Sequence, residues 1–198
     1  MTVIKNLFYT ALMYILDFRV QITSVISLAV FILYIMMGTQ PVSVTDGNSP
    51  LGKCGWVIIM GGLLLRSWAA GILHKERTLA TNGPYSLTRH PLYMGTFLSA
   101  LGFAVLLNEI GFYAMVLALF FLVYLPKMRQ EERKMAARFG EQWDGFKQTT
   151  FMIFPRRFPP PILAPWQPSQ WWLNKEYRAI LPAAILLALM EWLSRHPL

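Results

Sequence analysis

The sequence is poor in cysteine and in charge. Cys54 is the single cysteine among 198 residues, so no disulfide can form within the chain. Only 14% of the residues are charged, whereas 55% are hydrophobic and the mean hydropathy is +0.42. A soluble domain of this length does not need so much apolar surface. The composition therefore indicates a membrane protein, and the length predicts one domain over residues 1–198.

Motifs for nucleic-acid binding are also missing, although the chain is basic. The net charge is +8 and the isoelectric point is about 9.8. Lys and Arg cluster beside apolar runs, and no interleaved glycine or RNA-binding motif accompanies them. This arrangement points to anionic lipid headgroups and to cytoplasmic loops, so we expect membrane lipids and not nucleic acid as partners.

The apolar runs predict an all-α, multi-pass bundle of about five membrane helices. Their lengths approach the roughly 20 residues that cross a bilayer. The expected helices cover residues 22–37, 53–73, 93–107, 110–125 and 179–193. Asn108-Glu109 is so short a connection that its two flanking helices must form an antiparallel hairpin, and Pro126 is expected to end that hairpin.

The N-terminal segment and the loops predict the orientation of the bundle. Residues 1–18 place apolar side chains three and four positions apart, which favours an amphipathic helix in the interface, with a first membrane span as the alternative. Residues 38–52 contain no Lys or Arg, which predicts that they form an outer loop. Basic residues within 73–92 and 127–177 predict that these segments face the cytoplasm.

One polar loop between two apolar runs carries an unusual density of functional side chains. It reads Gly83-Pro84-Tyr85-Ser86-Leu87-Thr88-Arg89-His90-Pro91-Leu92-Tyr93-Met94-Gly95. Pro91 lacks an N–H and suits the first turn of a helix, so Arg89 and His90 precede a helix N-terminus. Backbone donors and the positive end of the helix dipole can hold an anion there.

This loop, followed by a helical hairpin and by Glu131-Glu132, resembles the signature of the isoprenylcysteine carboxyl methyltransferase family, which has membrane relatives among phospholipid methyltransferases. The resemblance implies a pocket that faces the cytoplasm, binds S-adenosylmethionine and lies within about residues 74–147. It also implies a lipophilic or lipid-linked acceptor, most simply a carboxylate. We expect a bacterial cytoplasmic membrane as the location.

The resemblance further implies which residues form the site. The expected cofactor contacts are Arg77, Thr78, Leu79, Ala80, Tyr85, Arg89, His90, Pro91, Leu92, Tyr93, Glu131 and Glu132. In this scheme His90 holds the cofactor's carboxylate, Glu131 its ammonium, and the tyrosines its sulfonium. The candidate catalytic cations that would position an anionic acceptor are Arg66, which interrupts an apolar run, together with Lys127 and Arg129.

Three other functions remain open from the sequence. The methyl acceptor can be an amine or a thiol in place of a carboxylate, and a phospholipid N-methyltransferase is one alternative. A steroid-reductase-like membrane enzyme that uses NADPH would share a similar His-Pro-x-Tyr loop, and a membrane scaffold would have no activity. The combination of Arg89 to Gly95 with Glu131-Glu132 favours the methyltransferase. No glycine-rich Rossmann motif is present, so a soluble-type methyltransferase fold is not indicated.

Overall fold

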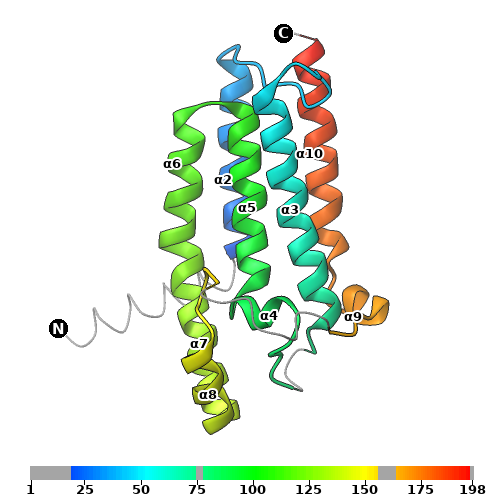
Figure 1. The fold of residues 1–198 in the computed structure, drawn as a ribbon. Coiled ribbons are helices and arrows are strands. Elements are labelled where there is room, and N and C mark those ends of the chain that lie inside the picture. Colours follow the sequence, from blue (N-terminus) through cyan, green and yellow to red (C-terminus); the bar gives the residue numbers. More distant parts are fainter. Residues whose placement is uncertain (1–18, 75–77, 156–163, 197–198) are drawn as a thin grey trace, which may run out of the picture.

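The computed structural model describes residues 19–74, 78–155 and 164–196, and it confirms the all-α membrane bundle (Figure 1). Within these residues the long helices are α2 (Arg19–Met36), α3 (Pro50–Ile72), α5 (Pro91–Leu107), a continuous helix from Ile110 to Phe139, and α10 (Tyr177–Arg195). Residues 1–18, for which an amphipathic helix is expected, lie outside the described residues.

Helix length and hydropathy separate the bundle helices into two groups. Pro50–Ile72, Ile110–Phe139 and Tyr177–Arg195 are long and apolar enough to cross a membrane. Thr23–Met36 and Pro91–Leu107 are shorter apolar helices. The shorter pair runs alongside the long helices, with α5 between α6 and α3 and with α2 behind α5 (Figure 1).

Helices α3 and α5 pack with almost no space between their backbones. A Cβ atom added to Gly62 would lie 2.6 Å from the Gly95 carbonyl oxygen and 2.4 Å from Ser99 Oγ. Gly102 meets Ile59 and the Gly55 carbonyl in the same way. These small residues thus form a packing seam that fixes α5 against α3.

The hairpin arm does not end at Pro126, contrary to the sequence-based expectation. Helix α6 (Ile110–Leu119) passes through a π-helical turn, η1 (Phe120–Tyr124), directly into α7 (Leu125–Phe139). In this turn the Leu125 N–H bonds to the Phe120 carbonyl five residues earlier. The extra residue makes room for the Pro126 ring, which would otherwise clash with the preceding turn.

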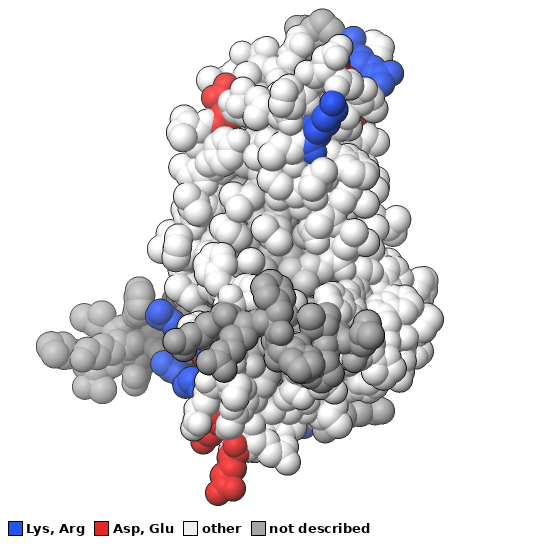
Figure 2. Space-filling view, in the orientation of Figure 1, with Lys and Arg blue, Asp and Glu red and all other residues white. Residues whose placement is uncertain are grey.

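The two ends of the bundle differ in what they carry. The α2–α3 loop, the Asn108-Glu109 connection and the last turn of α10 gather at one end (Figure 1). Helices α4 (Pro84–Leu87), α7, α8 (Glu141–Thr149) and α9 (Pro168–Leu173) gather at the other. On the face drawn in Figure 2, charged side chains lie at both ends and the band between them has none. The grouping matches the loop assignment from charge, and we call the end with α4 the inner end.

The apolar core fills the half of the bundle near the outer end. Buried members from α2, α3, α5, α6 and α10 form one cluster that includes Phe31, Ile59, Leu106, Phe112 and Met190. The Tyr34 hydroxyl donates a 2.6 Å hydrogen bond to the Leu107 carbonyl and ties α2 to α5 there. The buried polar and charged side chains described next lie mainly at the inner end.

Candidate functional site

The loop before α5 is held in place by a distant part of the chain. Gly83 adopts φ 60°, a conformation that favours glycine, and Pro84 follows as the first residue of α4. Thr88 Oγ1 donates to the Met152 carbonyl at 2.7 Å, and the Arg89 N–H donates to the Phe151 carbonyl at 2.8 Å. Because these bonds pair the loop with the segment after α8, residues outside the motif fix its shape.

Arg89 and His90 converge on Glu132 of α7. Arg89 Nε lies 2.7 Å from Glu132 Oε1, and His90 Nε2 lies 3.5 Å from the same oxygen. Arg89 Nη1 also donates to the carbonyls of Lys147 and Thr150. The Arg89 and Glu132 side chains are only 9% and 11% exposed, so they form a nearly buried ion pair whose contacts join the loop before α5 to α7 and α8.

Tyr93 and Glu131 form a second contact between the same two helices. The Tyr93 hydroxyl donates a 2.6 Å hydrogen bond to Glu131 Oε1. The Tyr93 ring lies edge-on to His90, with centroids 5.7 Å apart, and to Tyr124, with centroids 5.8 Å apart. The structure therefore brings together the motif loop and the acidic pair, as the sequence predicts for Tyr93, His90 and Glu131.

Tyr85 contributes a buried hydroxyl to this inner-end cluster. The side chain is 6% exposed, and its hydroxyl has no hydrogen-bond partner among the described residues. Burial, with further contributions from the negative charges of Glu131 and Glu176, raises the pKa of Tyr85 well above its ordinary value. The neutral hydroxyl is thus available as a donor at any ordinary pH.

Arg66 reaches the cluster from α3 and has an acidic partner that the sequence analysis missed. Its Nε lies 2.8 Å from Glu176 Oε1, and its Nη2 lies 3.1 Å from Glu176 Oε2. Nη1 donates to the Leu92 carbonyl at 3.3 Å and to the Thr96 hydroxyl, both in the first turns of α5. The pairing spans 110 residues, so no local pattern in the sequence could reveal it.

The other two candidate cations occupy different environments on α7. Lys127 is buried at 6% exposure, whereas Arg129 is exposed. A helical offset of two residues turns side chains to different sides of the helix. The structure therefore brings Lys127 into the protein and leaves Arg129 outside it, and the catalytic role expected of these cations stays a prediction.

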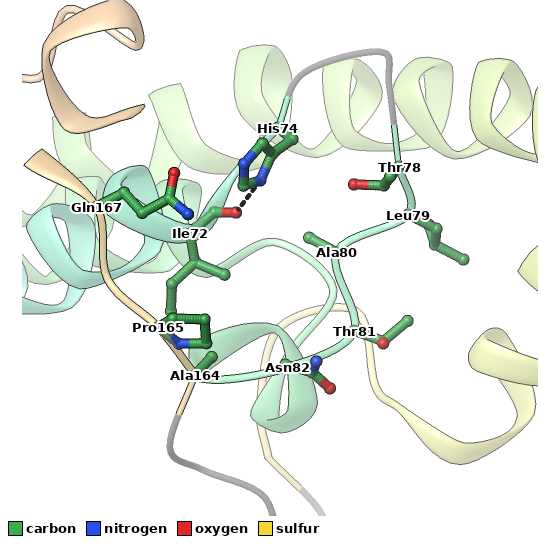
Figure 3. A pocket seen from close by; sticks show the side chains of 10 residues that line it. All are labelled: Ile72, His74, Thr78, Leu79, Ala80, Thr81, Asn82, Ala164, Pro165 and Gln167. Carbon is green, nitrogen blue, oxygen red and sulfur yellow. Dashed lines mark hydrogen bonds between the residues drawn. The ribbon is translucent and has the colours of Figure 1, made fainter. Parts of the chain in front are cut away.

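The loop after α3 borders two cavities at the inner end. The first, of about 170 Å³, lies between Ile72, His74, the loop from Thr78 to Asn82, and residues 164–167 (Figure 3). His74 turns its ring back to the Ile72 carbonyl, 3.0 Å from Nδ1. The second, of about 660 Å³, lies between the same loop and α8. Thr78 and Leu79 line both cavities and Ala80 lines the first, whereas Arg77 lies outside the described residues.

A third cavity of about 230 Å³ lies inside the apolar layer. It is bounded by α2, α5, α6 and η1, and half of its lining residues carry hydroxyl groups. These are Thr23, Ser24, Ser27, Tyr93, Thr96 and Tyr124. Tyr93 and Thr96 are also hydrogen-bonded to the charged cluster, through Glu131 and Arg66 respectively. We call this third cavity the intramembrane cavity, and it adjoins the polar cluster. Neither Tyr93 nor His90 lines the two inner-end cavities.

Comparison with known proteins places this geometry in context. Residues 55–137 match the model of the isoprenylcysteine carboxyl methyltransferase (ICMT) family, which confirms the resemblance seen in the motif loop and the acidic pair. Two curated relatives are the cobalt-zinc-cadmium resistance protein CzcN of Cupriavidus metallidurans and the nickel-cobalt-cadmium resistance protein NccN of Alcaligenes xylosoxydans xylosoxydans. They are 37% and 33% identical over 93 residues, which is 46% of this chain. The chain spans about 43% of the length of each relative. No solved structure matches it.

Proposed function

We propose that this chain, whose residues 55–137 carry the ICMT-like family region, is a membrane methyltransferase that uses S-adenosylmethionine and methylates a lipophilic acceptor. The names of the curated relatives refer to metal resistance, and they describe those proteins. The proposal for this chain rests on the family region together with the side chains that its own inner end brings together.

The donor groups at the inner end fit the cofactor's functional groups. The N-terminus of α5, where the backbone N–H groups of Leu92 and Tyr93 follow Pro91, offers donors to a carboxylate. Glu131 offers an acceptor to an ammonium, and the buried hydroxyl of Tyr85 offers a donor with no partner of its own among the described residues. The faces of the Tyr93 and Tyr124 rings attract a sulfonium as they do other cations. When bound, the cofactor supplies an electrophilic methyl group.

The loop from Thr78 to Asn82 has room beside it for the rest of the cofactor. The cavity of about 660 Å³ between this loop and α8 falls in the size range of ligand pockets. Its lining mixes apolar side chains, such as Leu79 and Phe146, with polar ones, such as Thr78 and Gln142. An aromatic base with polar edges needs such a mixture, so we assign the adenosine part of the cofactor to this side of the loop.

The intramembrane cavity is suited to the acceptor's apolar part. Phe97, Met115 and Phe120 line it together with the hydroxyl-bearing residues, and none of the lining residues that the structure describes is Lys, Arg, Asp or Glu. A methyl acceptor that reaches Tyr93 from the membrane would meet the cofactor's side of the cluster without crossing water. If the acceptor is already anionic, as a carboxylate is, methyl transfer requires alignment and a dry site more than base catalysis.

The observation that carries the proposal is the position of Tyr93. It lines the intramembrane cavity, contacts His90 at the start of α5, and donates to Glu131 at 2.6 Å. One residue therefore joins the lipid side to the groups assigned to the cofactor. This arrangement predicts that both His90 and Glu131 contribute to cofactor binding. Neither of them lines the intramembrane cavity.

Calorimetry of S-adenosylmethionine binding to the detergent-solubilised full chain tests the assignment. We expect Glu131→Gln and His90→Ala each to weaken binding by about 1.5–3 kcal/mol, because the first removes the charged acceptor for the ammonium and the second removes the imidazole assigned to the carboxylate. Glu109→Gln at the exposed outer connection is the matched control and should bind as the wild type does. Unchanged affinity in both site variants would overturn the cofactor assignment.

Transfer of a labelled methyl group to a panel of total lipids and prenyl-cysteine compounds tests the acceptor. We expect label in a lipophilic product, and its chemical class distinguishes a carboxylate from an amine or a thiol. Binding of NADPH with a change in nicotinamide fluorescence, and no binding of S-adenosylmethionine, would instead support the reductase. Binding of neither nucleotide would support a scaffold.

A further inference from the structure

We propose that Glu176 is a positioning residue for the site: it acts through Arg66 to hold the first turns of α5 in place, and so supports cofactor binding without touching the cofactor. This inference rests on the proposed function, because cofactor affinity is its readout. Glu176 lies outside residues 55–137, and no sequence motif marks it.

The geometry of the ion pair orients the guanidinium of Arg66. Glu176 uses both carboxylate oxygens, at 2.8 Å from Nε and 3.1 Å from Nη2. A bidentate pair of this kind fixes the plane of the guanidinium and not only its distance. The remaining nitrogen, Nη1, then points to α5, where it donates to the Leu92 carbonyl and the Thr96 hydroxyl.

These two contacts bear on the part of α5 that carries the site. Leu92 lies between Pro91, the first residue of α5, and Tyr93, whose hydroxyl donates to Glu131. His90 directly precedes the helix. A shift of this first turn would therefore move the backbone donors, His90 and Tyr93 together. Thr96 also lines the intramembrane cavity, so the same guanidinium supports the proposed acceptor side.

A docked segment of the C-terminal part of the chain delivers Glu176 to Arg66. Asn174 Nδ2 donates to the Ala70 and Leu73 carbonyls at 2.8 Å each, at the end of α3. Trp171 Nε1 donates to Ser67 Oγ at 2.7 Å. With the segment fixed in this way, Glu176 is 3% exposed and has little water to replace its partner. The Glu176 carboxylate is thus a rigid support for Arg66.

A partly buried carboxylate near the other end of α10 provides a control. Glu191 of α10 accepts from Ser43 Oγ at 3.0 Å and from the Val44 N–H at 2.9 Å, and it pairs with Arg195 at 2.9 Å. Glu191→Gln therefore removes a carboxylate with several partners at the outer end, away from α4 and the start of α5 (Figure 1). If the effect is a general loss of bundle stability, both Glu176→Gln and Glu191→Gln should weaken cofactor binding. If Glu176 positions the site, only Glu176→Gln should weaken it.

The test is cofactor affinity by calorimetry, with thermal unfolding measured on the same detergent samples. We expect Glu176→Gln to weaken S-adenosylmethionine binding at least tenfold, and Glu191→Gln to change it less than twofold. Glu176→Asp keeps the charge and should recover part of the affinity. Equal affinity in Glu176→Gln and Glu191→Gln would overturn the proposal.

A double variant shows whether Glu176 acts through Arg66 and covers the case in which Glu176→Gln does not fold. Replacing both partners, as in Arg66→Met with Glu176→Leu, leaves no unpaired buried charge and is the better-tolerated change. We expect the double variant to fold and to bind as weakly as Arg66→Met alone, because the two residues act as one unit. Wild-type affinity in the folded double variant would overturn the proposal. If the wild-type chain itself binds no S-adenosylmethionine, the proposed function fails instead.

Discussion

Each end of the bundle holds an Arg–Glu pair that involves α10 or the residue before it, and the two pairs differ in burial and in reach. At the inner end Arg66 and Glu176 are 20% and 3% exposed and lie 110 residues apart in the sequence. At the outer end Arg195 and Glu191 are 59% and 16% exposed and lie one helical turn apart. Only the inner pair joins separate elements around the site. The two pairs have the same chemical groups, but their loss should have different effects on the protein.

The physical reason for the difference is solvent. An exposed pair is screened by water and salt, and its loss changes stability by about 0–1 kcal/mol. A buried charge that loses its partner has no water to replace it, and the loss is about 3–5 kcal/mol. The comparison predicts that substitutions of buried, non-local contacts at the inner end lower the free energy of unfolding more than similar substitutions at exposed or local positions.

The largest effect is expected at Arg89. Its nearly buried side chain pairs with Glu132 and also donates to two carbonyls near the end of α8. Arg89→Met should lower the free energy of unfolding by about 3–5 kcal/mol, because it leaves the Glu132 carboxylate without its main counter-charge. Denaturant or thermal unfolding of the purified chain in detergent measures this change.

The matched control for this prediction is Arg195→Met at the outer end. Arg195 also pairs with a glutamate, but that glutamate keeps hydrogen bonds from Ser43 and the Val44 N–H after the arginine is removed. We expect a loss of about 1 kcal/mol or less. Equal losses in the two variants would show that burial does not distinguish the two ends.

An intermediate effect is expected where α3 and α5 touch. Gly62→Ala would place a Cβ atom 2.6 Å from the Gly95 carbonyl oxygen, so the helices must move apart. We expect a loss of about 1–3 kcal/mol in unfolding free energy. Gly61→Ala is the neighbouring control, because nothing lies within 4 Å of its added Cβ, and it should be neutral or stabilising by up to about 1 kcal/mol. A larger loss in Gly61→Ala would contradict the packing seam.

The smallest effect is a pH dependence that belongs to Tyr85. Burial raises the pKa of its hydroxyl in the folded protein, whereas the unfolded chain titrates at about 10. The unfolded state therefore loses this proton first, so the folded protein is destabilised as the pH rises above about 10, and the effect is absent below that pH. Between pH 9 and pH 11 the unfolding free energy of the wild type should fall by about 1 kcal/mol more than that of Tyr85→Phe.

Thermal unfolding at a series of alkaline pH values measures this difference. Tyr177→Phe, which removes a tyrosine that is only half-buried, is the control for a general change in alkaline stability. Identical pH profiles for wild type and Tyr85→Phe would show that the Tyr85 hydroxyl is not enclosed in solution. At neutral pH the Tyr85→Phe change should be nearly neutral, because the hydroxyl it removes has no partner among the described residues.

Several parts of the site were accessible from the sequence because they depend on order along the chain. The loop from Gly83 to Gly95 and the acidic pair Glu131-Glu132 lie on either side of a short-connected hairpin. Such a hairpin returns the chain to the side from which it left, so the two motifs had to face the same end of the bundle. The structure confirms this for Tyr93 and Glu131, whose contact measures 2.6 Å.

Other features could not be predicted because they depend on contacts between distant residues. Arg66 interrupts an apolar run, but its ion pair with Glu176 spans 110 residues, and no local pattern in the sequence indicates it. The sequence also suggested that Pro126 ends its helix, whereas the π-helical turn before it lets the helix continue. Whether a helix continues through a proline depends on the space around the preceding turn, and tertiary packing determines that space.

By itself the sequence determined the class of structure and the order of the polar motifs along the chain. Apolar runs of near-bilayer length must form helices, since backbone groups in lipid can be satisfied only within the segment, and small residues spaced by turns must lie on one face. The tertiary structure alone decided which charge meets which, where the cavities open, and that Glu176 pairs with Arg66. These outcomes depend on distances between elements far apart in the chain, and a buried charge accepts whichever opposite charge the packed helices bring within hydrogen-bond reach.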